Sequence, residues 1–312
     1  MGVGVGDEGR NNAFGALRLA FASLVIVSHV PELVDGDRGR EILTRLTGTT
    51  SFGELAVEGF FIISGFLITG SLARGGSVGS YLFKRAARIY PAFVVASALS
   101  LLVAAPLAGA RLEQGPLRTV ASAVFHMAVL ARPMVVGAFP GQHHNEWGSA
   151  LNGATWTIQY EFACYLLVIP LVRAGLARRP AWLAGAALLC LAAGGALQPD
   201  ALPRLQGHTF FPVPFPQALR LGGMFLAGAA FRALGRRLKF RPSLMVAAAV
   251  GLAASLLVEP LAGIGVALFG GYLIFGAAEL GGSTWLARIN NRNDISYGVY
   301  LYTYTHGPCS AS

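Results

Sequence analysis

Long apolar runs of about 16 to 22 residues, bounded by charged residues, proline or glycine, alternate with short polar segments along the chain. They predict helices near residues 13–33, 52–72, 90–109, 119–138, 153–172, 181–197, 216–233, 243–258 and 262–281. At about 1.5 Å per residue, the longer runs can each cross a hydrocarbon core of about 30 Å. A tenth run begins near Ile295 and has only about ten residues before a polar ending, too few to span. The pattern predicts an all-α, polytopic transmembrane bundle of about ten helices, the last one truncated, in a single domain over residues 1–312.

Composition supports a membrane protein. Of the 312 residues, 54% are hydrophobic and 12% are charged, whereas an ordinary soluble domain carries about 25% charged residues. That balance excludes a soluble enzyme, a disordered chain and a disulfide scaffold. The net charge of +9 would also suit nucleic-acid binding, but the basic residues gather between apolar runs, as they do in membrane proteins. We therefore expect a lipid bilayer and no nucleic acid as partner, and no metal, because the cysteines lack metal-ligand spacing.

The basic loops do not agree on one orientation. With the amino terminus inside, the loop holding Arg74 and Lys84 is cytoplasmic, and strict alternation then places the later basic clusters outside. A re-entrant or half-spanning segment between residues 111 and 153 restores the alternation. We expect it in the irregular stretch 137–153.

Ionisable residues inside apolar helices are the first candidates for function, because burying one costs several kcal/mol unless it is paired or hydrated. Arg18 and His29 are eleven residues apart in the first run, which places them on one helix face about 16 Å apart along the axis. Two such residues on one face are typical of a polar cavity in a membrane protein. A neutral imidazole there can take a proton from an attacking hydroxyl. The alternative is an arginine at the interface and a histidine bonded to a backbone carbonyl.

Glu58 and the pair Ser64-Gly65 interrupt an apolar and aromatic run over residues 57–68. A carboxylate in such a run favours a functional role. Ser64 and Gly65 either allow close helix packing or a kink, or form part of a binding site, and both interpretations stay open.

Lys84, Arg85 and Arg88 form a basic motif directly before the third predicted helix. Arg85 and Arg88 share a face if that turn is helical, so their guanidinium groups can clamp a phosphate-bearing ligand at the membrane surface. A basic run at this place is also typical of a topology anchor or a lipid contact.

A polar island lies at residues 152–165, in the fifth predicted helix. Thr157 and Glu161 share a helix face, and Asn152 and Trp156 come just before them. A buried carboxylate among asparagine, threonine, glutamine and tyrosine side chains is expensive to keep for packing alone. We therefore expect a functional role for Glu161.

Taken together, these segments resemble the acyltransferase-3 family of integral membrane acyltransferases. The resemblance rests on Arg18 followed by His29, on the Ser-Gly-Phe-Leu core of 58–68, on Lys-Arg-x-x-Arg at 84–88, on 156–161, and on Asp-Ile-Ser-Tyr-Gly-Val-Tyr-Leu at 294–301. It implies transfer of an acyl group, most often acetyl from acetyl-CoA, to a sugar hydroxyl of a cell-surface or exported glycan such as lipopolysaccharide or exopolysaccharide. It also implies a multi-pass protein of the inner (cytoplasmic) membrane, with acyl-CoA and a carbohydrate acceptor as partners.

The resemblance implies roles for the residues singled out above. The expected catalytic residues are His29, Arg18, Glu58 and Glu161; those expected to bind acetyl-CoA are Lys84, Arg85, Arg88, Ser64 and Gly65; those expected to bind the acceptor are Trp156, Asn152 and Tyr297. A thioester is already activated, so the protein must mainly position it and supply a base, for which His29 is the best candidate. Whether His29 takes the proton or itself carries the acyl group stays open.

Two departures from the family pattern stand out. Lys84 replaces the arginine that commonly opens the basic motif, and after Leu301 the chain turns polar where the family continues an apolar helix. The rival functions are a transporter or flippase of envelope glycan intermediates, in which the intramembrane charges form a path, and an inactive truncated relative. A transporter is expected to show internal symmetry between its halves, and the sequence shows none.

Overall fold

The computed structural model describes residues 12–35, 37–104, 106, 116–131, 155–197, 215–290 and 294–302. Within these ranges the regular elements are all helices, which confirms the all-α prediction. The longer helices are α1 (Phe14–Asp35), α3 (Phe52–Ala73), α4 (Val78–Leu99), α6 (Pro116–Ala128), α7 (Trp156–Arg173), α8 (Pro180–Ala196), α9 (Phe215–Leu234), α10 (Pro242–Leu256) and α12 (Gly271–Gly281). The short helices are α2 (Ile42–Thr47), α11 (Glu259–Gly265) and α13 (Ser296–Tyr302). Two π-helical turns, Ser100–Ala104 and Val266–Gly270, extend α4 and join α11 to α12; 3₁₀ turns lie at Arg38–Arg40, Leu176–Arg178, Gly235–Arg237 and Trp285–Arg288.

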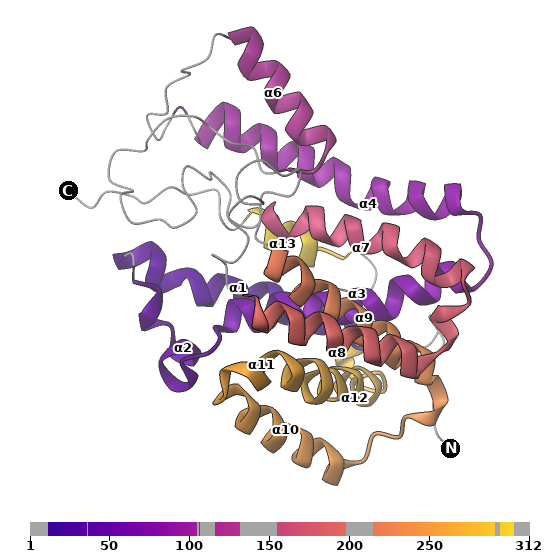
Figure 1. The fold of residues 1–312 in the computed structure, drawn as a ribbon. Coiled ribbons are helices and arrows are strands. Elements are labelled where there is room, and N and C mark those ends of the chain that lie inside the picture. Colours follow the sequence, from indigo (N-terminus) through magenta and orange to yellow (C-terminus); the bar gives the residue numbers. More distant parts are fainter. Residues whose placement is uncertain are drawn as a thin grey trace.

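Helices α3 and α9 lie in the middle of the bundle (Figure 1). Helix α3 contacts α1, α7 and α9, and α9 also packs along α8. Helices α4 and α6 lie on one side of this centre, and α10, α11 and α12 lie on the opposite side (Figure 1). The short α13 packs against α1 and α4, which brings the end of the described chain next to its beginning.

Helix α3 begins at a capping box. The Ser51 hydroxyl accepts from the Glu54 N–H at 3.1 Å, and the Glu54 carboxylate accepts from the Ser51 N–H at 3.2 Å. This pairing satisfies N–H groups that the first turn of a helix leaves without a partner. Apolar residues then follow on all sides of the helix, and 78% of Phe52–Ala73 is buried. A helix that is apolar all round belongs at the centre of a bundle.

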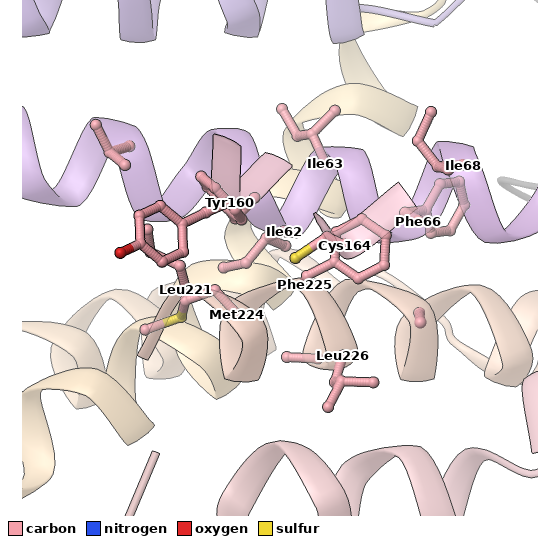
Figure 2. Packing of buried hydrophobic residues seen from close by; sticks show 14 of the residues in the cluster. Ile62, Ile63, Phe66, Ile68, Tyr160, Cys164, Leu221, Met224, Phe225 and Leu226 are labelled. Carbon is pink, nitrogen blue, oxygen red and sulfur yellow. The ribbon is translucent and has the colours of Figure 1, made fainter. Parts of the chain in front are cut away.

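Two glycines let α3 and α9 cross with their backbones in contact. A Cβ atom on Gly65 would collide with the carbonyl oxygen of Phe225, and a Cβ atom on Gly228 would collide with the carbonyl oxygen of Ile62. Figure 2 shows Ile62, Phe66 and Phe225 packed where the two helices meet. Close approach at small residues is a usual mode of helix association in membranes. The crossing fixes α3, and with it the side chains on the faces of α3 that do not touch α9.

The outside of the bundle carries many apolar side chains. Val94, Val95 and Leu99 are exposed on α4, and Val246 and Val250 are exposed on α10. Such a surface suits contact with lipid rather than water. Among the described helices, four segments are long and apolar enough to cross a membrane: Phe14–Pro31, Phe52–Ala73, Val78–Val103 and Glu259–Gly281. Together these observations describe a multi-pass membrane protein.

The third predicted helix, 90–109, has the wrong start. Helix α4 begins at Val78, with the hydroxyl of Ser77 accepting from the Ser80 N–H at 3.2 Å. The basic motif 84–88 therefore lies inside a helix and not before one. Charged residues suggested a loop there, but arginine and lysine are good helix formers, and the arginines of this motif find partners inside the bundle.

Two further differences concern the loops. Helix α2 lies where no helix was predicted, and Glu41 caps it by accepting from the Thr44 N–H at 2.7 Å. The predicted re-entrant stretch 137–153 and the chain after residue 302 lie outside the described residues.

Candidate active site

A single carboxylate joins two arginines from different helices. The Oδ2 atom of Asp294, just before α13, accepts from Nη1 of Arg18 on α1 at 2.7 Å and from Nη2 of Arg88 on α4 at 2.5 Å. The side chain of Arg18 is 12% exposed and that of Asp294 is 26% exposed. Two guanidinium groups so close together repel each other strongly in partly apolar surroundings, and the shared carboxylate offsets that repulsion.

The other oxygen of Asp294 is held by its own chain segment. Oδ1 accepts from Nδ2 of Asn290 at 3.0 Å, from the Ser296 N–H at 3.2 Å and from the Ser296 hydroxyl. Asn290 has a φ of 55°, a left-handed conformation that asparagine tolerates better than most residues. Its Nδ2 also donates to the carbonyl oxygen of Gly15 at 3.1 Å, which ties this segment to the start of α1. The backbone thus directs Asp294 at the arginines.

These partners keep Asp294 ionised. Burial raises the pKa of its carboxyl, but Arg18, the Ser296 hydrogen bond and Arg88 outweigh burial and lower the pKa to about 2. At neutral pH Asp294 is therefore a fixed negative charge between two positive charges.

Glu161 on α7 faces the same region. Its Oε1 accepts from the Tyr165 hydroxyl and lies 3.4 Å from the Ser64 hydroxyl of α3. Its charge interacts with those of both Arg18 and Arg88. Four helices therefore contribute charged or polar side chains to one place in the bundle.

A small pocket, with a cavity volume of about 30 Å³, opens at this place. The Thr157 hydroxyl of α7 and the Tyr300 hydroxyl of α13 are hydrogen-bonded at 2.8 Å in its wall. The lining combines polar groups with aromatic rings: Arg18, Val57, Phe60, Phe61, Ser64, Thr157, Glu161, Ser296, Tyr297 and Tyr300. An apolar wall with a few converging polar groups is typical of a site for a small ligand or for one end of a larger one.

The basic motif of α4 directs its arginines inward. The Arg85 guanidinium lies 5.8 Å from the centroid of the Tyr81 ring and 6.0 Å from that of Tyr165, within cation–π range. The Nε atom of Arg85 is buried and has no hydrogen-bond partner among the described residues. Lys84, in contrast, is exposed. Arg85 and Arg88 thus share the inner face of α4, although neither belongs to the described lining of the pocket.

His29 lies toward the other end of α1. Its Nδ1 is 2.7 Å from the Val25 carbonyl oxygen, which can only accept, so Nδ1 is the donor of this bond and the neutral form of the ring has its lone pair on Nε2. The ring packs near the start of α3, where a Cβ on Gly53 would lie 3.5 Å from its Cε1. The bond to a carbonyl is the alternative that the sequence left open, although this tautomer is also the one that a base needs. Arg18 lines the pocket, whereas His29 is not part of its described lining.

Glu58 is paired with an arginine that was not among the residues predicted for the site. Arg220 of α9 donates from Nε to Glu58 Oε1. Glu58 is 2% exposed, and its Oε2 has no hydrogen-bond partner among the described residues. The sequence contains a signal for Arg220, because it is an ionisable residue in an apolar run, and the same criterion points to Glu58. Asp294 was likewise part of a recognised pattern but was given no role.

The remaining predicted residues lie partly in the pocket lining and partly elsewhere. Tyr297 lines the pocket, as does Ser64, while the neighbouring Gly65 lies at the crossing with α9, where packing accounts for it. Trp156 opens α7 and packs against the hydrophobic core. Asn152 lies outside the described residues. In the part of the chain that the structure describes, no three His, Cys, Asp or Glu side chains converge as metal ligands.

The fold and the site together define a multi-pass membrane protein with a charged pocket between its helices. The model of a family described as an acyltransferase domain, acyltransferase-3, matches residues 11–305. The chain therefore belongs to this acyltransferase family, which confirms the resemblance seen in its sequence.

Several curated relatives carry acyltransferase names. The chain is 30% identical to an O-acetyl transferase of Shigella phage Sf6 over 164 residues, 51% of this chain and 45% of the relative. It is 31% identical to Nodulation protein 10 of Rhizobium leguminosarum bv. viciae over 51% of this chain and 44% of the relative. It is 29% identical to Acyltransferase MdmB of Streptomyces mycarofaciens over 49% of this chain and 38% of the relative. The chain thus matches less than half the length of each of these relatives, and no solved structure matches it.

Proposed function

We propose that this protein is an O-acyltransferase of the inner membrane that transfers an acyl group, with acetyl as the expected group, from acyl-CoA to a hydroxyl of a cell-surface or exported glycan such as lipopolysaccharide or exopolysaccharide. The observation that carries the proposal is the pocket where Arg18, Ser64 and Glu161 meet, inside a chain that belongs to an acyltransferase family. The name of the phage relative supports an acetyl group and an oxygen acceptor.

In the proposed reaction the acceptor hydroxyl oxygen attacks the thioester carbonyl carbon. A base takes the hydroxyl proton, the carbon–sulfur bond breaks, and the CoA thiolate leaves. Because the thioester is already activated, the protein's tasks are to position both substrates and to remove the proton. Negative charge develops on the carbonyl oxygen, where Arg18 at the pocket is suited to stabilise it. Arg85 and Arg88 are the proposed partners of the CoA phosphates.

Two side chains compete for the role of base. His29 remains our proposed base, because a neutral ring whose Nδ1 donates to the Val25 carbonyl oxygen has its lone pair on Nε2, as proton removal requires. Glu161 is the competing candidate, because it lines the pocket and His29 does not belong to the described lining. The two candidates lie on different helices, so single substitutions separate them.

The test measures transfer of labelled acetyl from acetyl-CoA by membranes that contain the full chain. We expect the wild type to transfer label and His29→Ala to lose transfer at an unchanged protein level. His126→Ala is the matched control, because His126 on α6 makes the same kind of bond, with Nδ1 at 2.7 Å from the Ser122 carbonyl oxygen, but is not among the described pocket residues. Loss of acetyl transfer in Glu161→Gln, together with full acetyl transfer in His29→Ala, would assign the role of base to Glu161.

Mass spectrometry of surface glycans identifies the acceptor. Cells with and without the gene are expected to differ by the mass of one acetyl group, and fragmentation then locates the modified hydroxyl. A wild-type chain that transfers no label and leaves the glycans unchanged would overturn the proposed function and leave the two rivals, a transporter and an inactive relative.

A further inference from the structure

We propose that Asp294 is a positioning residue for the acyl-donor site: a built-in counter-ion that holds Arg18 and Arg88 together and presents their remaining N–H groups to the donor. The inference rests on the proposed function and goes beyond it, because it assigns a role to a residue outside the predicted catalytic and donor-binding sets.

Asp294 does not use all the hydrogen-bond donors of the two arginines. Asp294 uses one oxygen for both, accepting from Nη1 of Arg18 and from Nη2 of Arg88. A guanidinium group has five N–H donors, and Nε of Arg18 is buried without a hydrogen-bond partner among the described residues. The pair is therefore oriented by Asp294 but not saturated by it. A phosphate or a developing oxyanion can use the donors that remain.

Asp294 also has a local structural role, which can be separated from the electrostatic one. Its Oδ1 accepts from Asn290 and from the N–H and hydroxyl of Ser296 at the start of α13. The amide oxygen of an asparagine can accept the same hydrogen bonds. The amide nitrogen of an asparagine can only donate, so it would face two guanidinium groups that can also only donate. Asp294→Asn therefore keeps the local contacts and removes the bridge.

Loss of the bridge is expected to redirect the arginines. With Asp294 neutral, Glu161 is, among the described residues, the remaining carboxylate whose charge interacts with both Arg18 and Arg88. We expect one or both guanidinium groups to turn toward Glu161, which alters the pocket and weakens donor binding. If Asp294 had a mainly structural role, its substitution would not selectively weaken binding of the acyl donor.

The first experiment measures acetyl transfer as a function of acetyl-CoA concentration. Asp294→Asn is expected to lower kcat/KM for acetyl-CoA at least tenfold, the effect of losing a charge-assisted hydrogen bond, with the larger part in KM. Asp37→Asn is the matched control, because Asp37 is an exposed loop aspartate whose side chain accepts from the Gly39 N–H. Unchanged kcat/KM in Asp294→Asn, with an active wild type, would overturn the inference and leave the proposed function intact.

The second experiment does not depend on activity. Asp294→Ala leaves a space beside both arginines that formate, a small carboxylate, can fill. We expect formate to raise the melting temperature of purified Asp294→Ala. Formate should not change the melting temperature of the wild type or of the double variant Asp294→Ala/Arg88→Ala. Absence of a selective shift would refute the counter-ion role even if the wild type proved inactive on acetyl-CoA, in which case the proposed function would fail separately.

Discussion

The buried pair of Glu58 and Arg220 allows a quantitative test of whether an intramembrane charge in this protein serves catalysis or packing. Arg220→Met keeps much of the side-chain volume and removes the charge, so Glu58, which is 2% exposed, loses its partner. The carboxyl must then stay charged among apolar side chains or take up a proton. Removing one partner of a buried ion pair costs about 3 to 5 kcal/mol. We expect the lower end of that range, because the Arg220 side chain is 28% exposed.

Thermal unfolding in detergent measures this cost. At about 2 °C per kcal/mol for a large domain, Arg220→Met should melt about 6 °C below the wild type. Glu58→Gln should lose less, because the Arg220 left behind reaches the surface. The double variant Glu58→Gln/Arg220→Met should melt above Arg220→Met alone, because it removes the uncompensated charge. Arg241→Met, at an exposed arginine before α10, is the control and should melt as the wild type does.

Two results would refute this reasoning. If the double variant loses as much as the two single variants together, the residues are not energetically coupled. Acetyl transfer separates the roles further: a catalytic Glu58, as the sequence predicts, requires that Glu58→Gln and the double variant both be inactive although folded. A pair that only stabilises the bundle requires that activity follow the folded fraction and recover in the double variant.

Three further predictions follow from the same contacts. Gly65→Ala should destabilise the crossing of α3 and α9 by about 1 to 3 kcal/mol through overpacking. Gly222→Ala on α9, where a Cβ meets no described residue within 4 Å, should melt at or slightly above the wild type. The pKa of Asp294 is lowered from 3.8 to about 2, so its ionised carboxylate stabilises the folded protein fully at neutral pH, and this stabilisation is lost as the pH falls through that range. The difference in melting temperature between wild type and Asp294→Asn should therefore be constant from about pH 7 to about pH 5 and vanish toward pH 2. Arg85→Ala should weaken acetyl-CoA binding about tenfold or more. Arg45→Ala, at an exposed arginine of α2, is the control and should leave binding unchanged. Unchanged binding in Arg85→Ala would favour the interpretation of the basic motif as a topology anchor.

Helix positions follow from the sequence where a run is both long and apolar. Helix α3, predicted at 52–72, spans Phe52–Ala73, and α9, predicted at 216–233, spans Phe215–Leu234. The start of α4 was predicted wrongly because Lys84, Arg85 and Arg88 were interpreted as loop residues. A single sequence shows their charge, but it does not show that Arg85 and Arg88 have partners inside the bundle, whereas Lys84 is exposed.

The same limit explains which site residues the sequence finds. Helical periodicity relates residues a few positions apart, so it detects Arg18 and Glu161 as misplaced charges within their own helices. It does not show that Asp294 lies beside Arg18 and Arg88, which are 276 and 206 positions away. Nor does it show that Glu58 lies beside Arg220, 162 positions away. Pairing between helices depends on how the helices pack, and that arrangement becomes visible only in three dimensions.

The intramembrane charges fall into two kinds once their partners are known. Glu58 and Arg220 form a simple pair, in which each charge offsets the other. Around the pocket, Arg18 and Arg88 face Asp294 and Glu161, but the Nε atoms of Arg18 and of the nearby Arg85 are buried without a hydrogen-bond partner among the described residues. A balanced pair limits the cost of burial. A cluster with unused donors beside a pocket limits the same cost while keeping the capacity to bind an anion. For this reason we propose that the acyl donor binds at Arg18 and Arg88, with His29 or Glu161 as the base, rather than at Glu58.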